Sequence, residues 1–542
     1  MKASRVVIGT VAGVLVVSLS ACTVLPLPFP IGKKSPTEVT ATTQTTASSP
    51  LPVPQHVYTD WTSPDRPVIK VADYPARPPG VTDPPPGSGY DRYLKQPVKW
   101  IPCQTSKGEC ATVLAPLDWT QPDGTAITLA MKRVTATAPL TDKASPDIFI
   151  NPGGPGGSAQ DYVDGFKKTG LEGYNIVGLD PRGSGESTPV VCGTTAQLDA
   201  YFGLDMSPNN DAAKTALING AKAFAMQCRQ NSGALLDHIS SIEAVYDFDM
   251  VRQLLGDAKF NWVGTSYGTY LGAVYLELYP QNAGRMVLDA AVNITENDSV
   301  SQMDGFELAL HKYAQWVVSQ GRAASEQTVL NRIDTFAKHL KTNPIPVGSR
   351  KLTQSLFITG LALFMYLGTA VYAQLTSVLD ATMSGEGSYM LQAADALNGR
   401  NTDGYDSMAT AFPAIGCKDG ADEGLDKAFS QWKTDAANAP IFGTYMGPDV
   451  ICSVWTSRPA AQIDFSGAGA PPFIVIGGTG DNATPYQYAQ WMVKQMPAGV
   501  LVTRDGVGHG SYGSGSTCVD SIVRSFFVAG TVPAANTVCQ MG

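Results

Sequence analysis

Short apolar runs alternate with amphipathic stretches in the part of the chain that follows Trp100. The apolar runs are rich in β-branched residues and predict strands at 127–135, 147–150, 174–179, 261–263, 286–288 and 473–476. Apolar residues with helical spacing predict helices between them, at 211–232, 240–255, 267–279 and 485–495. Such alternation is typical of an α/β fold with a mostly parallel sheet, whose active site lies at the carboxyl ends of the strands.

The alternation stops between residues 299 and 465. Helical spacing continues there without a clear strand, in 301–320, 325–341, 354–366 and 370–383. The strand pattern returns at Pro472. We therefore predict a helical cap domain at 299–465, inserted into a core formed by 96–298 and 466–542, which is large enough to fold as one domain.

The first residues have the layout of a secretory signal peptide, predicted at 1–21. Lys2 and Arg5 precede an apolar run that is shorter than the ~20 residues of a membrane-spanning helix, although an uncleaved anchor is the alternative. Cys22 follows Leu-Ser-Ala and resembles the lipidated cysteine of a bacterial lipobox. We expect an extracytoplasmic protein, anchored to the cell membrane by a lipid on Cys22. Residues 22–95 are rich in Pro and Thr and predict a tether and an N-terminal extension.

The chain has nine cysteines, and eight of them, an even number, remain when Cys22 is set aside. An even number fits an oxidising compartment, and eight cysteines allow 105 pairings. We predict that neighbours in the chain pair, because each pair would close a short loop: Cys103–Cys110, Cys192–Cys228, Cys417–Cys452 and Cys518–Cys539. Neither a Cys-x-x-Cys nor a His-Glu-x-x-His motif occurs, so we expect no metal and no other cofactor.

The mature chain is acidic. Removal of residues 1–21 takes away Lys2 and Arg5, which leaves 36 basic and 47 acidic residues and a formal charge of −11. Such a surface repels phosphate backbones, so we expect no nucleic-acid partner, whereas a cationic substrate such as a peptide amine would be attracted.

A candidate nucleophile lies between a predicted strand and a predicted helix. The residues Gly-Thr-Ser-Tyr-Gly at 264–268 fit the Gly-x-Ser-x-Gly pattern, with Ser266 at its centre. A chain with 54 glycines can contain this pattern by chance. The strand–turn–helix context, however, is the one that a nucleophile elbow requires, because glycines let strand and helix close tightly around the serine.

An acid and a base follow in the order that this fold uses. Asp481 comes just after the strand at 473–476, and His509 lies between two glycines. We predict that His509 is the general base of Ser266 and that Asp481 orients it, with Asp289 as the alternative acid. The remaining histidines fall in the tether, at a helix start or in cap helices: His56, His238, His311 and His339.

The glycine-rich loop 151–158 follows the strand at 147–150. The lysine of a phosphate-binding loop and the glycine spacing of a dinucleotide-binding loop are both missing. We therefore expect an oxyanion hole, with backbone N–H groups from Gly154, or Gly153 as the alternative, and from Tyr267.

Taken together, these motifs resemble the proline iminopeptidase and tripeptidyl aminopeptidase branch of the α/β hydrolases, especially its secreted actinobacterial members. The resemblance covers residues ~100–542 and rests on 151–156, on Asp-Pro-Arg-Gly-Ser-Gly-Glu-Ser at 180–187, and on 264–268, 480–481 and 508–509. Asn151 stands where iminopeptidases proper carry histidine.

The resemblance implies a serine peptidase that releases short peptides or single residues from free N-termini and acts as a monomer. Acids of the cap would hold the substrate's α-ammonium group, and the segment 414–419, which resembles a cap motif of the family, makes Asp419 the candidate. A solvated loop acid beside a disulfide is the alternative for Asp419. A carboxylesterase or lipase with the same triad, or a surface protein that binds envelope components, are the alternative functions.

Overall fold

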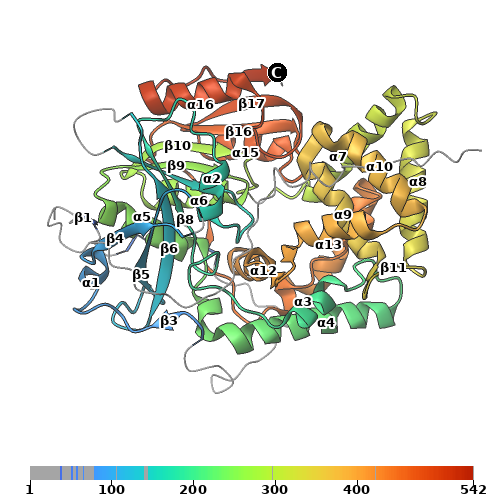
Figure 1. The fold of residues 1–542 in the computed structure, drawn as a ribbon, viewed down its shortest axis with the longest axis horizontal. Coiled ribbons are helices and arrows are strands. Elements are labelled where there is room, and N and C mark those ends of the chain that lie inside the picture. The colour runs from blue at the N-terminus through green and yellow to red at the C-terminus, as the bar shows by residue number, and fades with distance from the viewer. Residues whose placement is uncertain are drawn as a thin grey trace, which may run out of the picture. The chain divides into compact units, whose positions relative to one another are not determined.

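The computed structural model describes residues 78–540, apart from 105, 139–144, 296 and 421–422, and the short segments 37–39, 51–52, 57–58 and 65. The predicted signal peptide, the lipid site Cys22, His56 and most of the predicted tether lie outside the described residues. The described chain forms a large, mostly parallel sheet with helices around it, which confirms the predicted fold class (Figure 1).

Twelve strands of the described residues form one sheet, in the order β1-β4-β5-β6-β8-β7-β9-β10-β16-β17-β18, with β3 paired to β6. In this order, all neighbouring strands from β8 to β18 pair parallel. The pairs that precede them, including β6 with β8, are antiparallel, as is the pair of β3 with β6. The bounds are β1 Thr37–Val39, β3 Val81–Thr82, β4 Val98–Pro102, β5 Glu109–Pro116, β6 Ala126–Val134, β7 Asp147–Asn151, β8 Asn175–Leu179, β9 Phe260–Thr265, β10 Ala283–Asp289, β16 Phe473–Gly480, β17 Gly499–Val507 and β18 Thr537–Gln540.

Helices cover both faces of this sheet. Successive side chains of a strand point to opposite faces, so each strand shows what packs on either side. In β7, Phe149 packs in one apolar cluster, while Ile148 and Ile150 pack in another. The first cluster includes residues of α5, α6 and α15, and the second includes residues of α2 and α16. Strands buried on both faces explain the continuous apolar runs in the sequence. The bounds are α1 Asp91–Leu94, α2 Ala159–Gly165, α5 Ser241–Leu255, α6 Tyr267–Leu278, α15 Tyr486–Gln495 and α16 Thr517–Ala529.

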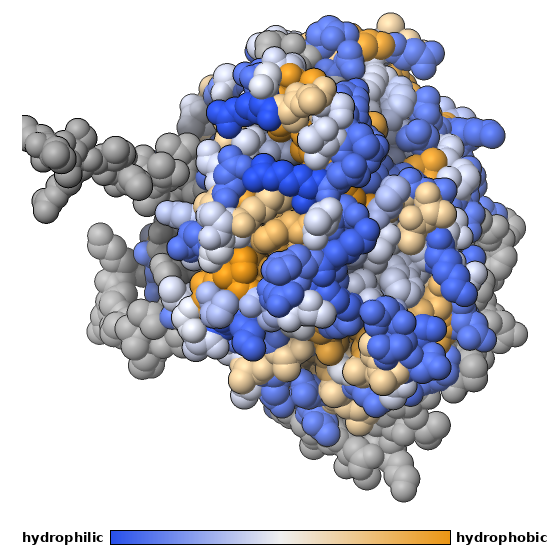
Figure 2. Space-filling model, turned by 90° about the vertical axis from the view of Figure 1, so that its right-hand side faces the viewer, coloured by the Kyte–Doolittle hydropathy of each residue, from blue (hydrophilic) through white to orange (hydrophobic). Residues whose placement is uncertain are grey.

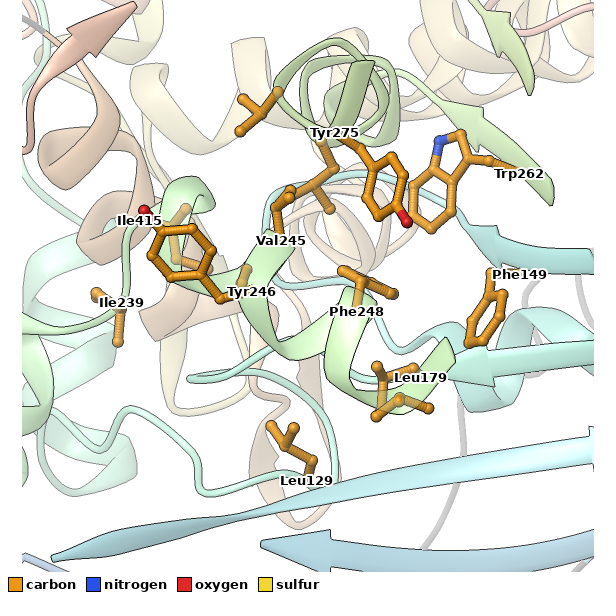
Figure 3. Close-up of a cluster of buried hydrophobic side chains, with 14 of the residues drawn as sticks. Leu129, Phe149, Leu179, Ile239, Val245, Tyr246, Phe248, Trp262, Tyr275 and Ile415 are labelled. Carbon is orange, nitrogen blue, oxygen red and sulfur yellow. The ribbon is translucent and has the colours of Figure 1, made fainter. Parts of the chain in front are cut away.

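Aromatic side chains fill the space between α5 and the sheet (Figure 3). Phe248 of α5 lies edge-on to Phe149 and Trp262, with ring centroids 6.4 and 5.1 Å apart. The indole N–H of Trp262 donates a hydrogen bond of 3.0 Å to the carbonyl oxygen of Gly268. The packing of the core therefore fixes the turn between β9 and α6, which carries Ser266.

The helices between β10 and β16 build a cap with a hydrophobic cluster of its own. Its members are α7 Gln302–Ser319, α8 Glu326–Leu340, α9 Gln354–Leu367, α10 Tyr372–Met383, α11 Ser388–Leu397 and α14 Phe442–Met446. Within the described residues, only the stretch Gln354–Met383 is long and apolar enough to span a membrane, and 61% of its most apolar window is buried. Figure 2 shows the face of the molecule on which the cap helices lie. This face is largely polar, with separate apolar patches. The burial indicates that the stretch is the core of the cap.

Two features of the segment 299–465 differ from the prediction. Short strands do occur in it, namely β11 Ile345–Val347 with β12 Arg350–Leu352, β13 Arg400–Asn401 with β14 Gly404–Tyr405, and β15 Gln462–Ile463 with β2 Val57–Tyr58. Two or three residues are too few for an alternating pattern to be visible in a sequence. In addition, α12 Met408–Asp419 packs in the core cluster and not in the cap cluster.

The remaining helices lie between these elements along the chain. They are α3 Thr195–Phe202, α4 Asp211–Ser232, α13 Gly424–Asn438 and the short 3-10 helices η2 Gly233–Asp237, η3 Gly368–Val371 and η4 Cys452–Val454. Each of the four predicted cysteine pairs is a disulfide in the structure: Cys103–Cys110, Cys192–Cys228, Cys417–Cys452 and Cys518–Cys539.

Candidate active site

Ser266 occupies a strained turn at the end of β9. Its backbone angles, φ 57° and ψ −126°, are rare for a residue with a side chain. A Cβ atom on Gly264 would lie 2.2 Å from the carbonyl oxygen of Gly268, so only glycine at this position lets strand and helix approach so closely. The N–H of Ser266 donates a hydrogen bond of 2.9 Å to the carbonyl oxygen of Asp289 in β10. These features are those of a nucleophile elbow.

His509 and Asp481 lie side by side after β17 and β16. The His509 Nδ1 atom is 2.8 Å from Asp481 Oδ1. Asp481 also accepts backbone N–H bonds from Ala483 at 3.0 Å, from Thr484 at 2.9 Å and from Gly510 at 3.3 Å. A carboxylate that accepts a hydrogen bond from the Nδ1–H group leaves Nε2 of the imidazole as the free base.

The charges of this pair support each other. Burial by itself would lower the pKa of His509, but the Asp481 carboxylate raises it above its ordinary value. Burial would likewise raise the pKa of Asp481, yet the charge and hydrogen bond of His509 and the backbone donors hold that pKa below its ordinary value. The arrangement stabilises an imidazolium ion paired with a carboxylate.

Asp289, the alternative acid, has different partners. It is 1% exposed, and its Oδ2 atom accepts N–H bonds from Ser511 and Tyr512, both at 2.8 Å. Among the described residues, the carboxylate hydrogen-bonded to His509 is that of Asp481 alone. Asp289 thus anchors the chain that follows His509.

Two contacts of the histidine loop were not predicted from the sequence. The carbonyl oxygen of Tyr366, at the end of the cap helix α9, accepts a bond of 3.2 Å from the N–H of His509, and the two rings lie edge-on at 5.3 Å. The buried guanidinium of Arg504 donates to the carbonyl oxygens of Val507, at 3.3 Å, and Gly508. Arg504 could have been found in the sequence, because it is a single basic residue in the strand that leads to this loop. Tyr366 gave no signal, because its backbone makes the contact.

The glycine loop after β7 lies against the elbow. A Cβ atom on Gly153 would be 2.6 Å from the carbonyl oxygen of Thr265 and 3.0 Å from the N–H nitrogen of Tyr267. The N–H of Gly153 donates to the buried Asn151 side chain at 2.9 Å. The N–H groups of Gly154 and Tyr267 have no hydrogen-bond partner in the described part of the chain. Of the two predicted glycines, Gly154 is therefore the one with a donor to offer.

Comparison with known proteins agrees with this geometry. Residues 439–539 match the family described as TAP-like protein. The chain is 34% identical over 457 residues to carboxylesterase B of Mycobacterium tuberculosis. The alignment covers 79% of this chain and 86% of the relative. This chain is a TAP-like α/β hydrolase. It is 29% identical over 486 residues to serine protease Hip1 of the same organism (82% and 91% covered), and 26% identical over 459 residues to a tripeptidyl aminopeptidase of Streptomyces lividans (80% and 83% covered).

The motif at 180–187 holds the loops of this TAP-like site in place. Buried Asp180 accepts bonds from the N–H of Ala159, at 2.7 Å, and the side chain of Gln160, at 2.7 Å, at the start of α2. This helix directly follows the glycine loop. Arg182, fully buried, pairs with Asp247 of α5 at 2.7 Å. Because these bonds hold the helix after the glycine loop and tie the motif to α5, the motif has a structural role.

Asp419 lies at the end of α12, beside the residue that follows the nucleophile. Its carboxylate accepts bonds from the N–H of Ser241, at 2.8 Å, and from the Ser241 hydroxyl, at 2.6 Å. The hydroxyl of Tyr267 is 3.4 Å from Asp419 Oδ2. Burial raises the pKa of Asp419 to about 6. Asp419 is thus not a fully solvated loop acid. The side chain of Tyr267 separates its carboxylate from the backbone N–H of Tyr267.

One group of possible metal ligands occurs among the described residues, namely Asp118, His238 and Glu243. Nδ1 of His238 lies 2.9 Å from Glu243 Oε1, and the guanidinium of Arg182 lies 3.7 Å from the same oxygen. The imidazole and the guanidinium already face this carboxylate, so these contacts account for the group. His311 and His339 lie in the cap helices α7 and α8, as predicted.

Proposed function

We propose that this TAP-like hydrolase is a peptidase that removes short peptides from free N-termini, with Ser266, His509 and Asp481 as its catalytic triad. The observation that carries the triad is the hydrogen bond between His509 Nδ1 and Asp481, at the same edge of the sheet as the strained Ser266. The peptidase assignment is supported by two relatives, serine protease Hip1 and the tripeptidyl aminopeptidase.

The reaction follows from these positions. Ser266 Oγ transfers its proton to His509 Nε2 and attacks the carbonyl carbon of the scissile bond. The negative charge that develops on the carbonyl oxygen is stabilised by the N–H groups of Gly154 and Tyr267. His509 then gives its proton to the departing amine, and water, activated by the same histidine, hydrolyses the acyl-enzyme. Asp481 stabilises the charged imidazole in both halves of the reaction.

We propose Asp419 as the acid that binds the α-ammonium group of the substrate. A tripeptide spans at most ~11 Å when it is extended, since each residue adds about 3.3–3.6 Å. Asp419 lies beside the hydroxyl of Tyr267, whose backbone N–H serves the scissile carbonyl, so an acyl part of a few residues fits between the two points. The Ser241 and Tyr267 hydroxyls donate to Oδ2 of Asp419, but among the described residues Oδ1 accepts only the N–H of Ser241 and has a lone pair left for an ammonium group.

An acetylation test examines this proposal. We expect peptides with a free α-amine to be cleaved at least about thirtyfold more efficiently, in kcat/KM, than their N-acetylated forms, because acetylation removes a charge-assisted hydrogen bond worth ~2 kcal/mol. The preference should decrease below about pH 6, where Asp419 becomes protonated. Asp419→Asn should reduce it in the same way. Equal rates on both kinds of peptide would contradict the aminopeptidase assignment while leaving the triad intact.

An esterase is the second candidate function, because carboxylesterase B is 34% identical to this chain. The same triad would cleave an acyl ester, and esters react readily with an activated serine. Turnover of peptides therefore decides between the two, whereas turnover of esters does not. If the enzyme turns over acyl esters but cleaves no member of a peptide library, the esterase function is favoured.

We further propose that the mature chain begins at a lipidated Cys22 and works on the outer face of the cell membrane. The Leu-Ser-Ala-Cys sequence supports this proposal, as do four disulfides, which form in oxidising compartments. Mass spectrometry of the protein from membranes should find an N-terminal Cys22 that carries acyl chains. An unmodified or internal Cys22 in that fraction would overturn the proposal.

A further inference from the structure

Helix α12 lies between the sheet and the cap helices (Figure 1), and both of its ends contact residues of the active site. Before its first turn, the Ser407 hydroxyl accepts a bond of 2.7 Å from the N–H of Gly185 and donates to the carbonyl oxygen of Gly156 at 3.3 Å. Within its first turns, a Cβ atom on Gly156 would be 2.7 Å from the Ala411 side chain and 3.4 Å from the Phe412 nitrogen. The helix therefore begins in contact with the glycine loop and ends at Asp419, beside Tyr267.

Three residues of α12 share one face of this helix: Phe412, Gly416 and Asp419. Their spacing is i, i+4 and i+7, which places them in one row. Phe412 is 52% exposed, although it is a large apolar side chain next to a buried loop. Gly416 is exposed, and a Cβ atom there would meet nothing within 4 Å. A glycine in a helix interior is less favourable than alanine, so neither packing nor helix stability explains Gly416.

We propose that this row is the surface along which the acyl part of a peptide substrate lies, a proposal that rests on the peptidase function above. Phe412, beside the glycine loop, packs against the side chain that precedes the scissile bond. The bare backbone at Gly416 lets the extended peptide pass close to the helix. Asp419 ends the row at the α-ammonium group. The substrate class is then a short peptide with a free amine and a bulky apolar residue at the cleavage point.

The Gly416→Leu variant tests the central step. The added side chain enters open space and favours the helix, so the melting temperature should not fall. It should nevertheless block the peptide, and kcat/KM for Ala-Ala-Phe p-nitroanilide should drop at least about tenfold relative to kcat/KM for p-nitrophenyl acetate, because steric exclusion acts only on a substrate that reaches the row. Gly165→Leu is the matched control, since Gly165 is also exposed and has no atom within 4 Å of its Cβ position.

The Phe412→Ala variant tests the apolar contact. The preference for Ala-Ala-Phe over Ala-Ala-Ala p-nitroanilide should decrease about tenfold, as expected for the loss of one hydrophobic contact in a pocket. Tyr389→Ala is its control, because Tyr389 has the same 52% exposure and lies on α11, in the cap. If Gly416→Leu matches Gly165→Leu and Phe412→Ala matches Tyr389→Ala, the row does not bind substrate. If the wild-type protein cleaves no peptide at all, the peptidase function itself fails.

Discussion

Replacing Ser266 by alanine should reduce turnover of an activated ester by roughly 10⁵-fold or more, as in other enzymes whose triad acts as a unit. The serine hydroxyl forms the bond to substrate, and the alanine methyl group fits the turn that the Ser266 backbone already adopts at φ 57°. The melting temperature should therefore stay close to that of the wild type. Ester turnover of the purified variant, with a thermal melt of the same sample, checks both expectations. Wild-type turnover by Ser266→Ala would exclude Ser266 as the nucleophile.

The two buried acids near the histidine offer a sharper control. Asp481→Asn should lower kcat by about 10⁴-fold, because the amide holds the wrong tautomer of the imidazole. Activity needs neutral His509 and is lost as the pH falls through its pKa. Asp481 raises that pKa, so the residual activity of Asp481→Asn should extend to lower pH than that of the wild type. Asp289→Asn should shift this pH limb less, since Asp289 contacts backbone N–H groups and contributes less than Asp481 to the raised pKa of His509. The opposite pattern would assign the orienting role to Asp289.

Replacing Gly153 by alanine should cause a loss of about 10² to 10³-fold in kcat, comparable to the loss of one oxyanion donor. The new methyl group would lie 2.8 Å from Ser266 Cβ and 3.0 Å from the nitrogen of Tyr267, so it displaces the nucleophile or blocks access to the N–H. Gly153 also has φ +94°, which alanine adopts only with strain. Rates of ester turnover and of acyl-enzyme formation measure the effect.

The control for this substitution is Gly165→Ala in α2. Its Cβ position is open, and its φ lies outside the left-handed region, so kcat and the melting temperature should not change. A Gly153→Ala enzyme with the kcat of Gly165→Ala would show that the loop does not approach the reacting carbonyl.

The sequence predicted the parts of this molecule that depend on local chemistry. The elbow at Ser266 was predicted because strand, glycines and helix are contiguous in the chain. The four disulfides were predicted because each joins cysteines that are neighbours in sequence. Strands such as β7 and β9, with side chains buried on both faces, stand out as unbroken apolar runs.

What the sequence did not predict depends on contacts between distant segments. Tyr366 reaches the histidine loop through its carbonyl oxygen, which every residue has, so its identity carried no information. The short hairpins of the cap, such as β13 with β14, are too brief for a periodic pattern. The row on α12 became visible only when Gly156 and Tyr267 were placed at the two ends of that helix.

The bond between His509 and Tyr366 makes the cap a component of the catalytic machinery as well as a cover. If α9 moved away from the core, the N–H of His509 would lose its 3.2 Å partner, and the imidazole would lose the ring packed against its edge. The imidazole would then be held by its hydrogen bond to Asp481 without support from the cap. The position of the cap and the placement of the catalytic base are thereby coupled.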